Sequence, residues 1–398
     1  MSKTIEILES VDAQVIAWRR HLHRNPELSF QEHKTADYVE EQLLRMSGLT
    51  VSRPTPTSVL AVLPGRAGPG RTVLLRADMD ALPIHEESGV EFESETPGVM
   101  HACGHDGHTA MLLGAAQTLV AEQDDLHGEV RFIFQHAEEL FPGGAQQLVD
   151  VGIMDGVDVV IGTHLFSSIP VGQVALKSGP LMAAPDVFEV TIIGKGGHGA
   201  MPHETIDPIV IGAHVVTALQ SIVSRQRDPL EPAVVSVTTF HAGKAHNVIA
   251  NTATLTGTVR TFDADLRLKI PQQMERLIQG VTAGFGATCS FDYVYGYRAT
   301  VNDPEVTDAL REVVCSVLGD QALVDAQPTM GGEDFSAYLS QAPGAFVLIG
   351  ARNEELGITF PHHHPQFAID EQALQYGVKI FVGAAKQLSS TGSHRQRE

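Results

Sequence analysis

Cysteine and basic residues are both scarce in this chain. Only three of its 398 residues are cysteines, and 27 Lys and Arg stand against 48 Asp and Glu, which gives a net charge of −21. So few cysteines do not form a disulfide framework and are typical of a reducing compartment, so we expect a cytoplasmic location. The acidic balance argues against binding to nucleic acid or to an anionic membrane surface.

Long apolar runs are also missing from the sequence. The first ten residues, MSKTIEILES, contain acids and lack the apolar core of a signal peptide. No apolar run approaches the length that a membrane-spanning helix needs. We therefore expect no membrane association, and a small substrate rather than a polyanion.

The pattern of apolar residues predicts an α/β protein of two domains, because 398 residues exceed one ordinary core. Strands that alternate with helices predict a mainly parallel sheet. From about residue 184 the order becomes strand, helix, strand, strand, helix, strand, which is a ferredoxin-like βαββαβ unit. We predict a catalytic domain of residues 1–183 and 297–398, split by an inserted domain of residues 184–296.

Polar side chains follow several of the predicted strands. Asp80 comes after strand 72–76, Glu138 and Glu139 come after strand 130–135, and His164 comes after strand 157–162. Ligands of open α/β sheets bind at the carboxyl ends of the strands. We therefore expect these groups to share one crevice.

A cluster of metal-binding side chains occupies residues 100–108, before a predicted helix over 111–120. Cys103 and His105 flank a glycine, so both side chains can face one cavity. With Glu139, His164 and His363 they offer five donors, more than the three or four that one ion needs. The set predicts two divalent ions that share a ligand, and its mixed donors suit Zn, Mn, Co or Ni. For any single one of the 19 histidines, a hydrogen-bonded position in the core is the better interpretation.

The neighbouring carboxylates of Glu138 and Glu139 indicate two different roles for these side chains. Adjacent acids at a strand end repel each other, so a positive partner must stabilise them. One of them would bind metal, and the other would accept a proton from an activated water molecule. A solvated loop is the alternative, and the apolar neighbours Phe134 and Phe141 argue against it.

A glycine-rich stretch at residues 194–200 has neither the P-loop ending nor the dinucleotide-binding spacing, so we do not predict nucleotide binding. Its glycines would instead let His198 approach a ligand closely. Asn247 and Arg260 are candidates for holding a substrate carboxylate, Arg260 through its paired N–H groups. Spacing alone supports a plain surface or sheet-edge role for these two residues about equally well.

Taken in order, these segments resemble the metal-dependent aminoacylase/carboxypeptidase amidohydrolases of peptidase family M20, in the branch of the hippurate and auxin-conjugate hydrolases. The likeness runs from about His21 to Phe367. It rests on HRNPELS, RADMDALP, HACGHDGH, the Glu138–Glu139 pair, GTHL, GKGGHGAMPH, NVIAN, GTVRTF, GGEDF and HHPQF.

The resemblance implies roles for particular residues. The metal ligands would be Cys103, His105, Glu139, His164 and His363, with Cys103 as a candidate bridge; the motif H-x-P-x-F selects His363 from the three consecutive histidines. Glu138 would be the general base and acid, and Asp80 would orient the site. The insert would be a lid and dimerisation domain whose His198 reaches the partner's site, while Asn247 and Arg260 hold the substrate carboxylate.

The function that we predict is hydrolysis of the amide bond of a small N-acyl amino acid, hippurate-like or N-acetylated. The enzyme would be a homodimer or a higher homo-oligomer assembled through the lid domain. A dipeptidase or carboxypeptidase with the same centre is the first alternative. A non-catalytic metal-binding protein of the same fold is a second alternative, which the presence of Glu138 disfavours.

Overall fold

The computed structural model describes residues 2–390, and side chains from residue 12 onward. Within that range the chain forms two compact units. Unit 1 contains the residues up to Leu181, Val301–Gln327 and the residues from Asp334 on. Unit 2 contains Met182–Thr300 and Pro328–Glu333. Unit 2 is therefore slightly longer than the predicted insert of residues 184–296. It also contains the short segment Pro328–Glu333, just before Asp334.

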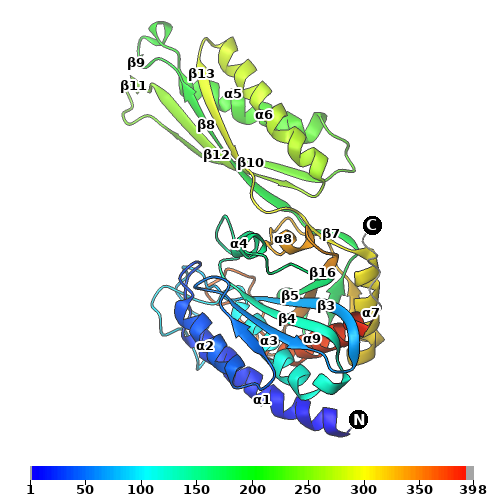
Figure 1. The fold of residues 1–398 in the computed structure, drawn as a ribbon. Helices are drawn as coiled ribbons and strands as arrows, with labels where there is room; N and C mark the ends of the chain where they lie inside the picture. The colour runs from blue at the N-terminus through cyan, green and yellow to red at the C-terminus, as the bar shows by residue number, and fades with distance from the viewer. Residues whose placement is uncertain (1, 391–398) are drawn as a thin grey trace. The chain divides into compact units, whose positions relative to one another are not determined.

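Unit 1 is built on an eight-stranded sheet whose central neighbours β4, β3, β5 and β16 run parallel (Figure 1). Its strands, in spatial order, are β1 (Thr50–Ser52), β2 (Val59–Pro64), β4 (His127–Gln135), β3 (Gly68–Asp78), β5 (Val159–Pro170), β16 (Gly344–Arg352), β6 (Val174–Leu176) and β15 (Leu323–Asp325). The strands β1, β2 and β6 run antiparallel to a neighbour. The mainly parallel α/β fold is therefore as predicted, with antiparallel additions toward the edges.

The helices of unit 1 cover the sheet, and their apolar faces form its core. They are α1 (Ser2–Arg24), α2 (His33–Leu44), α3 (His105–Ala121), α4 (Gly144–Asp150), α7 (Pro304–Leu318), α8 (Ser336–Leu339) and α9 (Gln372–Ser390). The helix α3 is apolar on nearly every side because it packs between the sheet and other helices. At the start of α7 the Asp303 side chain caps the helix by accepting from Val306 N, and Pro304 occupies its first position.

Unit 2 has the predicted βαββαβ order. Its antiparallel sheet runs β10 (Ala233–Ala242), β12 (Thr252–Thr261), β8 (Ala184–Ile193) and β13 (Thr288–Val294), and α5 (Pro208–Arg225) and α6 (Ala264–Gly284) pack on one face. Side chains of β12 alternate between buried and partly exposed, as expected for a sheet that is covered on one face. A short ribbon of unit 2 pairs β9 (Gly197–His198) with β11 (Val248–Ile249). The pair of β7 (Gly179–Met182) and β14 (Thr300–Asn302) lies mostly in unit 1.

Three details of the prediction are wrong. Strand β5 does not end at Gly162 but continues to Pro170, because β16 pairs with it from Val160 to Phe166 and, after a register shift, at Pro170, so His164 lies inside the strand. Helix α3 begins at His105 rather than near residue 111. One helix, α5, is long and apolar enough by length and composition to cross a membrane, contrary to the expectation of no such run, yet Ile211, Val215 and Leu219 pack into the core of unit 2.

Candidate metal centre

The centre is built around the turn that enters α3. Gly104 precedes the helix with φ +90°, a left-handed conformation that glycine adopts without strain. This conformation lets Cys103 and His105 stand on either side of the turn, both buried. Gly107 in the first turn of α3 allows a close approach to β5, because a Cβ atom there would lie 2.5 Å from Leu165 Cδ1.

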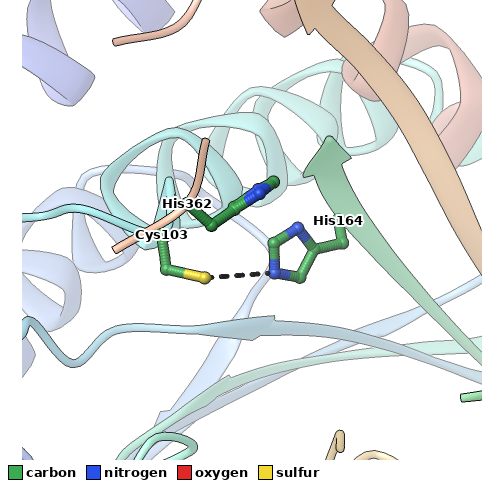
Figure 2. A group of neighbouring side chains, drawn as sticks. All are labelled: Cys103, His164 and His362. Carbon is green, nitrogen blue, oxygen red and sulfur yellow. Dashed lines mark hydrogen bonds between the residues drawn. The ribbon is translucent and has the colours of Figure 1, made fainter. Parts of the chain in front are cut away.

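One half of the centre joins Cys103 to His164 of β5. The thiol Sγ lies 3.5 Å from His164 Nε2 (Figure 2). His164 Nδ1 is 2.8 Å from the backbone oxygen of Leu165, to which it donates. This second contact fixes the tautomer, so Nε2 presents its lone pair toward the thiol, as ligating histidines in metal sites do.

The other half joins Cys103 to His105 and Glu139. His105 Nδ1 contacts the backbone oxygen of Asp80 at 2.9 Å and its carboxylate at 3.2 Å. His105 Nε2 is buried, has no hydrogen-bond partner among the residues that the structure describes, and lies 4.0 Å from Glu139 Oε1. A buried imidazole nitrogen without a partner is the position that a metal ion would satisfy.

The charges around this half favour a cation. Burial alone would lower the pKa of His105, but the carboxylates of Asp78, Asp80 and Glu139 outweigh it and raise that pKa to about 10. Burial, with help from Glu139 and Glu138, raises the pKa of the Cys103 thiol well above its usual value. A divalent ion would supply the missing positive charge and would convert the thiol into a thiolate.

Two histidines near the C-terminus compete for the last ligand position. His363 Nε2 is 3.1 Å from Glu139 Oε1, and its side chain is half-exposed. His362 lies beside Cys103 and His164 (Figure 2), but its Nε2 is 2.9 Å from Leu165 O and its Nδ1 is 2.8 Å from Ser167 Oγ. Both nitrogens of His362 are therefore engaged with the protein, and burial lowers its pKa to about 4.

Asp80 holds together the parts that meet at this edge of the sheet. Its two carboxylate oxygens accept from the backbone N–H groups of Glu138 and Glu139, at 3.1 and 3.0 Å. The Ser29 hydroxyl donates to the same carboxylate at 2.7 Å. Glu138 itself is buried, with 8% of its surface exposed. The sequence-predicted residues Asp80, Glu138 and Glu139 thus meet at one place in the fold.

Comparison with known proteins places this geometry in a family. The family model described as peptidase family M20/M25/M40 matches residues 74–387. The chain belongs to this family. M20 membership makes the protein a hydrolase of amide bonds, and the donor set described above fits the two divalent ions of a dinuclear centre.

Individual relatives agree with this assignment. An N-acyl-L-amino acid amidohydrolase of Geobacillus stearothermophilus is 61% identical over 299 residues, covering 75% of this chain and 80% of the relative. Thermostable carboxypeptidase 2 of Saccharolobus solfataricus is 44% identical over 374 residues, covering 93% and 94%. The solved structure of the Bacillus subtilis YXEP protein, described as a dinuclear metal-binding peptidase from the M20 family, superimposes with a TM-score of 0.85 at 36% identity and covers 96% of this chain and 99% of that one.

Behind the donors of this M20 protein lies a second set of buried polar groups that the sequence did not single out. Asp78 Oδ1 is 2.6 Å from His108 Nδ1, and His108 Nε2 accepts from Leu165 N at 2.8 Å. These contacts fasten β5 beside His164. The guanidinium of Arg76, with no exposed surface, donates to Asp78 at 2.6 Å and to Asp334 at 2.8 Å. Two sequence features could have pointed to these residues. Asp78 lies in the same motif as Asp80, and His108 follows His105 by one helical turn.

Three predicted site residues belong to unit 2. His198 of β9 is exposed, and its Nδ1 accepts from Ala200 N at 3.0 Å, so the neutral ring carries its proton on Nε2. Asn247 is next to this ribbon, since its backbone oxygen accepts from Gly199 N at 2.8 Å. Arg260 lies near the far end of β12, half-buried, where its Nε donates to Met330 O at 3.1 Å. The structure thus brings His198 and Asn247 together, but not Arg260.

Proposed function

We propose that the protein hydrolyses the amide bond of N-acyl amino acids at the centre in unit 1, releasing a carboxylate and a free amino acid. One observation carries the proposal. Cys103 belongs to two groups of donors whose atoms lie within 4.8 Å of one another, one with His164 and His362 and one with His105 and Glu139. A thiol that lies within reach of two donor groups fits a pair of ions with a shared ligand.

The reaction follows from the groups that surround these donors. When bound, two divalent ions supply Lewis-acid polarisation of the acyl carbonyl and lower the pKa of water. Glu138 accepts a proton from the attacking water and returns it to the leaving nitrogen, while the hydroxyl adds to the acyl carbon and the C–N bond breaks. Asp80 keeps both glutamates in place through their backbone N–H groups.

Residues of unit 2 are our candidates for binding the substrate carboxylate and the developing oxyanion. His198 has its proton on Nε2, which makes it a donor for the oxyanion. At about 3.3 Å per residue, β12 measures roughly 26 Å from Thr252, beside the ribbon, to Arg260. Asn247 and Arg260 of one copy therefore do not hold the same carboxylate. We assign His198 and Asn247 together to the substrate of a partner copy, and we keep Arg260 as a separate candidate for binding a substrate carboxylate.

A homodimer through unit 2 supplies that partner copy. Only 33% of the apolar helix α5 is buried, and Ile209 and Val210 are 43% and 48% exposed. The strand β10 next to it is an edge strand of the sheet. An exposed apolar helix beside an unpaired strand edge is the kind of surface that two copies of one chain cover symmetrically. The lid role of unit 2 belongs to the same proposal.

The identity of the metal and the cellular location remain predictions. Thiolate, imidazole and carboxylate donors suit Zn, Mn, Co or Ni, and availability selects among them as much as affinity does. Three free cysteines agree with a reducing, cytoplasmic environment.

A second candidate is a carboxypeptidase or dipeptidase that uses the same centre. Its support is the 44% identity to a thermostable carboxypeptidase over 93% of the chain. The chemistry at the metals would be identical, and the two functions differ only in whether the acyl group is itself an amino acid or peptide.

A substrate panel tests the proposal and separates the two candidates. The metal-loaded enzyme is offered hippurate, N-acetyl amino acids and dipeptides with the same C-terminal residue, and release of the free amino acid is measured. We expect kcat/KM to be at least about tenfold higher for the N-acyl amino acids, a difference of about 1.4 kcal/mol in transition-state binding. Preference for the dipeptides would establish the second candidate instead, and a Glu138→Gln variant shows which turnover belongs to this centre.

A further inference from the structure

The segment around residues 28–32 contains a fully buried acid that the proposed reaction does not use. Glu32 has no exposed surface, and its Oε1 accepts the backbone N–H of Ala137 at 2.8 Å. Its other oxygen, Oε2, has no hydrogen-bond partner in the part of the chain that the structure describes. A carboxyl group buried in this way is costly, so its position calls for an explanation.

Ala137 begins the turn that carries Glu138, the proposed base, and Glu139. It has φ +49°, in the left-handed region that strains a residue with a Cβ atom. Glu138 and Glu139 follow it directly. If Ala137 relaxed to an extended conformation, the chain would turn both glutamates away from their present positions.

Four hydrogen bonds hold this turn against relaxation. Glu32 accepts from Ala137 N, and the two oxygens of Asp80 accept from Glu138 N and Glu139 N. Gly144 N donates to Ala137 O at 2.9 Å, and a Cβ atom at Gly144 would lie 1.9 Å from the backbone oxygen of His136. Three successive backbone N–H groups therefore point at two buried carboxyl groups from elsewhere in the sequence.

The segment that carries Glu32 is fastened to the same place. Ala81 N donates to Glu27 O at 2.8 Å, which ties the segment next to Asp80. The Ser29 hydroxyl donates to Asp80, and the ring of Phe30, itself at φ +66°, packs edge-on against His136 with centroids 5.7 Å apart. The segment thus makes three contacts near the turn, with Asp80, with its neighbour Ala81 and with His136.

We propose that Glu32 is a positioning residue that holds Ala137 in its left-handed conformation and thereby places Glu138 for proton transfer. The proposal rests on the proposed function, with Glu138 as the base. Glu32 acts through one accepting oxygen and needs no charge for it. Burial and the nearby Asp80 raise the pKa of Glu32 to about 8, so the side chain is a neutral acid at neutral pH, which lets it lie close to the ionised Asp80.

The test compares side chains of equal length at position 32. Glu32→Gln keeps an accepting oxygen without charge, whereas Glu32→Met fills the space and accepts nothing. We expect Glu32→Met to lose about 10–100-fold in kcat with KM within about threefold and metal content unchanged, because small misplacements of a catalytic group have effects of this size. We expect Glu32→Gln to restore kcat to within about threefold of the wild type.

A neighbour in the same segment serves as the matched control. The Glu27 side chain accepts from the backbone and hydroxyl of Thr35, in the first turn of α2, at 2.8 and 2.9 Å. Glu27→Met removes the accepting oxygen at this position and should lower the unfolding midpoint while leaving kcat unchanged. If Glu32→Met does not fold, Ser29→Ala replaces it, because it removes only the hydroxyl that donates to Asp80; a several-fold fall in kcat is then expected.

Three results would overturn the proposal: wild-type kcat in Glu32→Met, a loss in Glu32→Gln as large as in Glu32→Met, or an unchanged kcat in Ser29→Ala when it stands in for Glu32→Met. A wild-type enzyme without amidase activity would instead contradict the proposed function, so the two failures are distinguishable.

Discussion

Glu138 and Glu139 are neighbours in the sequence with different partners in the fold. Glu139 lies 3.1 Å from His363 and 4.0 Å from His105, among the metal donors. Glu138 is buried beside it and is assigned to proton transfer. The positions of the two side chains depend on the backbone conformation of Ala137 and on the hydrogen bonds of Asp80. The turn therefore determines which glutamate lies among the metal donors.

Glu138→Gln removes the proton acceptor and keeps the size of the side chain. We expect kcat to fall by about 10²–10⁴, the usual contribution of a general base, while two ions remain bound. Steady-state kinetics and metal analysis on the same sample check this. Turnover at the wild-type rate would show that another group accepts the proton.

Glu32 gives a pH dependence of stability whose sign is fixed by its raised pKa. The ordinary value is 4.5 and the folded value is about 8, so between these pH values the folded protein holds a proton that the unfolded chain has released. The contribution of Glu32 to stability is therefore greatest below pH 4.5 and declines as the pH rises to about 8. Glu32→Gln has no such titration.

The measurement is the urea midpoint of the metal-loaded wild type and of Glu32→Gln at several pH values. The variant should gain stability relative to the wild type from pH 5 to pH 8 and show a constant difference above that range. A difference that does not change with pH would mean that Glu32 is already ionised in the folded protein.

At the scale of elements, β5 and β16 place His164 in the centre and must lie close together. A Cβ atom at Gly344 of β16 would lie 2.1 Å from the backbone oxygen of Val160, which no side-chain movement relieves. Gly344→Ala should therefore destabilise the protein by about 1–3 kcal/mol. Gly280→Ala in α6 meets no atom within 4 Å and should be neutral or stabilising by up to about 1 kcal/mol. Chemical unfolding midpoints check both, and equal midpoints would contradict this account of the strand pair.

The elements themselves were largely predictable because local patterns determine them. The start of α7 follows from Asp303 and Pro304, and the alternating strands of unit 2 follow from period-two hydrophobicity. The position of His164 inside β5 was not predictable, because the strand continues through pairing with β16, nearly 200 residues away in the sequence. The contacts of Glu32 with Ala137 and of His108 with Leu165 also join distant segments, so no local pattern reveals them.

At the scale of the whole molecule, the proposed assignment of His198 to a partner copy makes a prediction about mixtures. His198→Ala and Glu138→Gln should each be nearly inactive alone. After the two are mixed and allowed to exchange subunits, half of the dimers combine both chains, and one of their two sites has an intact Glu138 and an intact His198. Roughly a quarter of wild-type activity should return. A mixture that stays inactive after subunit exchange has been verified would show that each chain uses its own His198.

The proposed mechanism needs two ions bound at the donors that Cys103 connects. The decisive measurement removes metal with a chelator, returns a divalent ion in small steps, and follows bound metal and amidase activity together. We expect activity to return only as binding approaches two ions per chain, and we expect Cys103→Ala not to reach this occupancy. Full turnover by the metal-stripped protein, or by Cys103→Ala without a second ion, would contradict this mechanism.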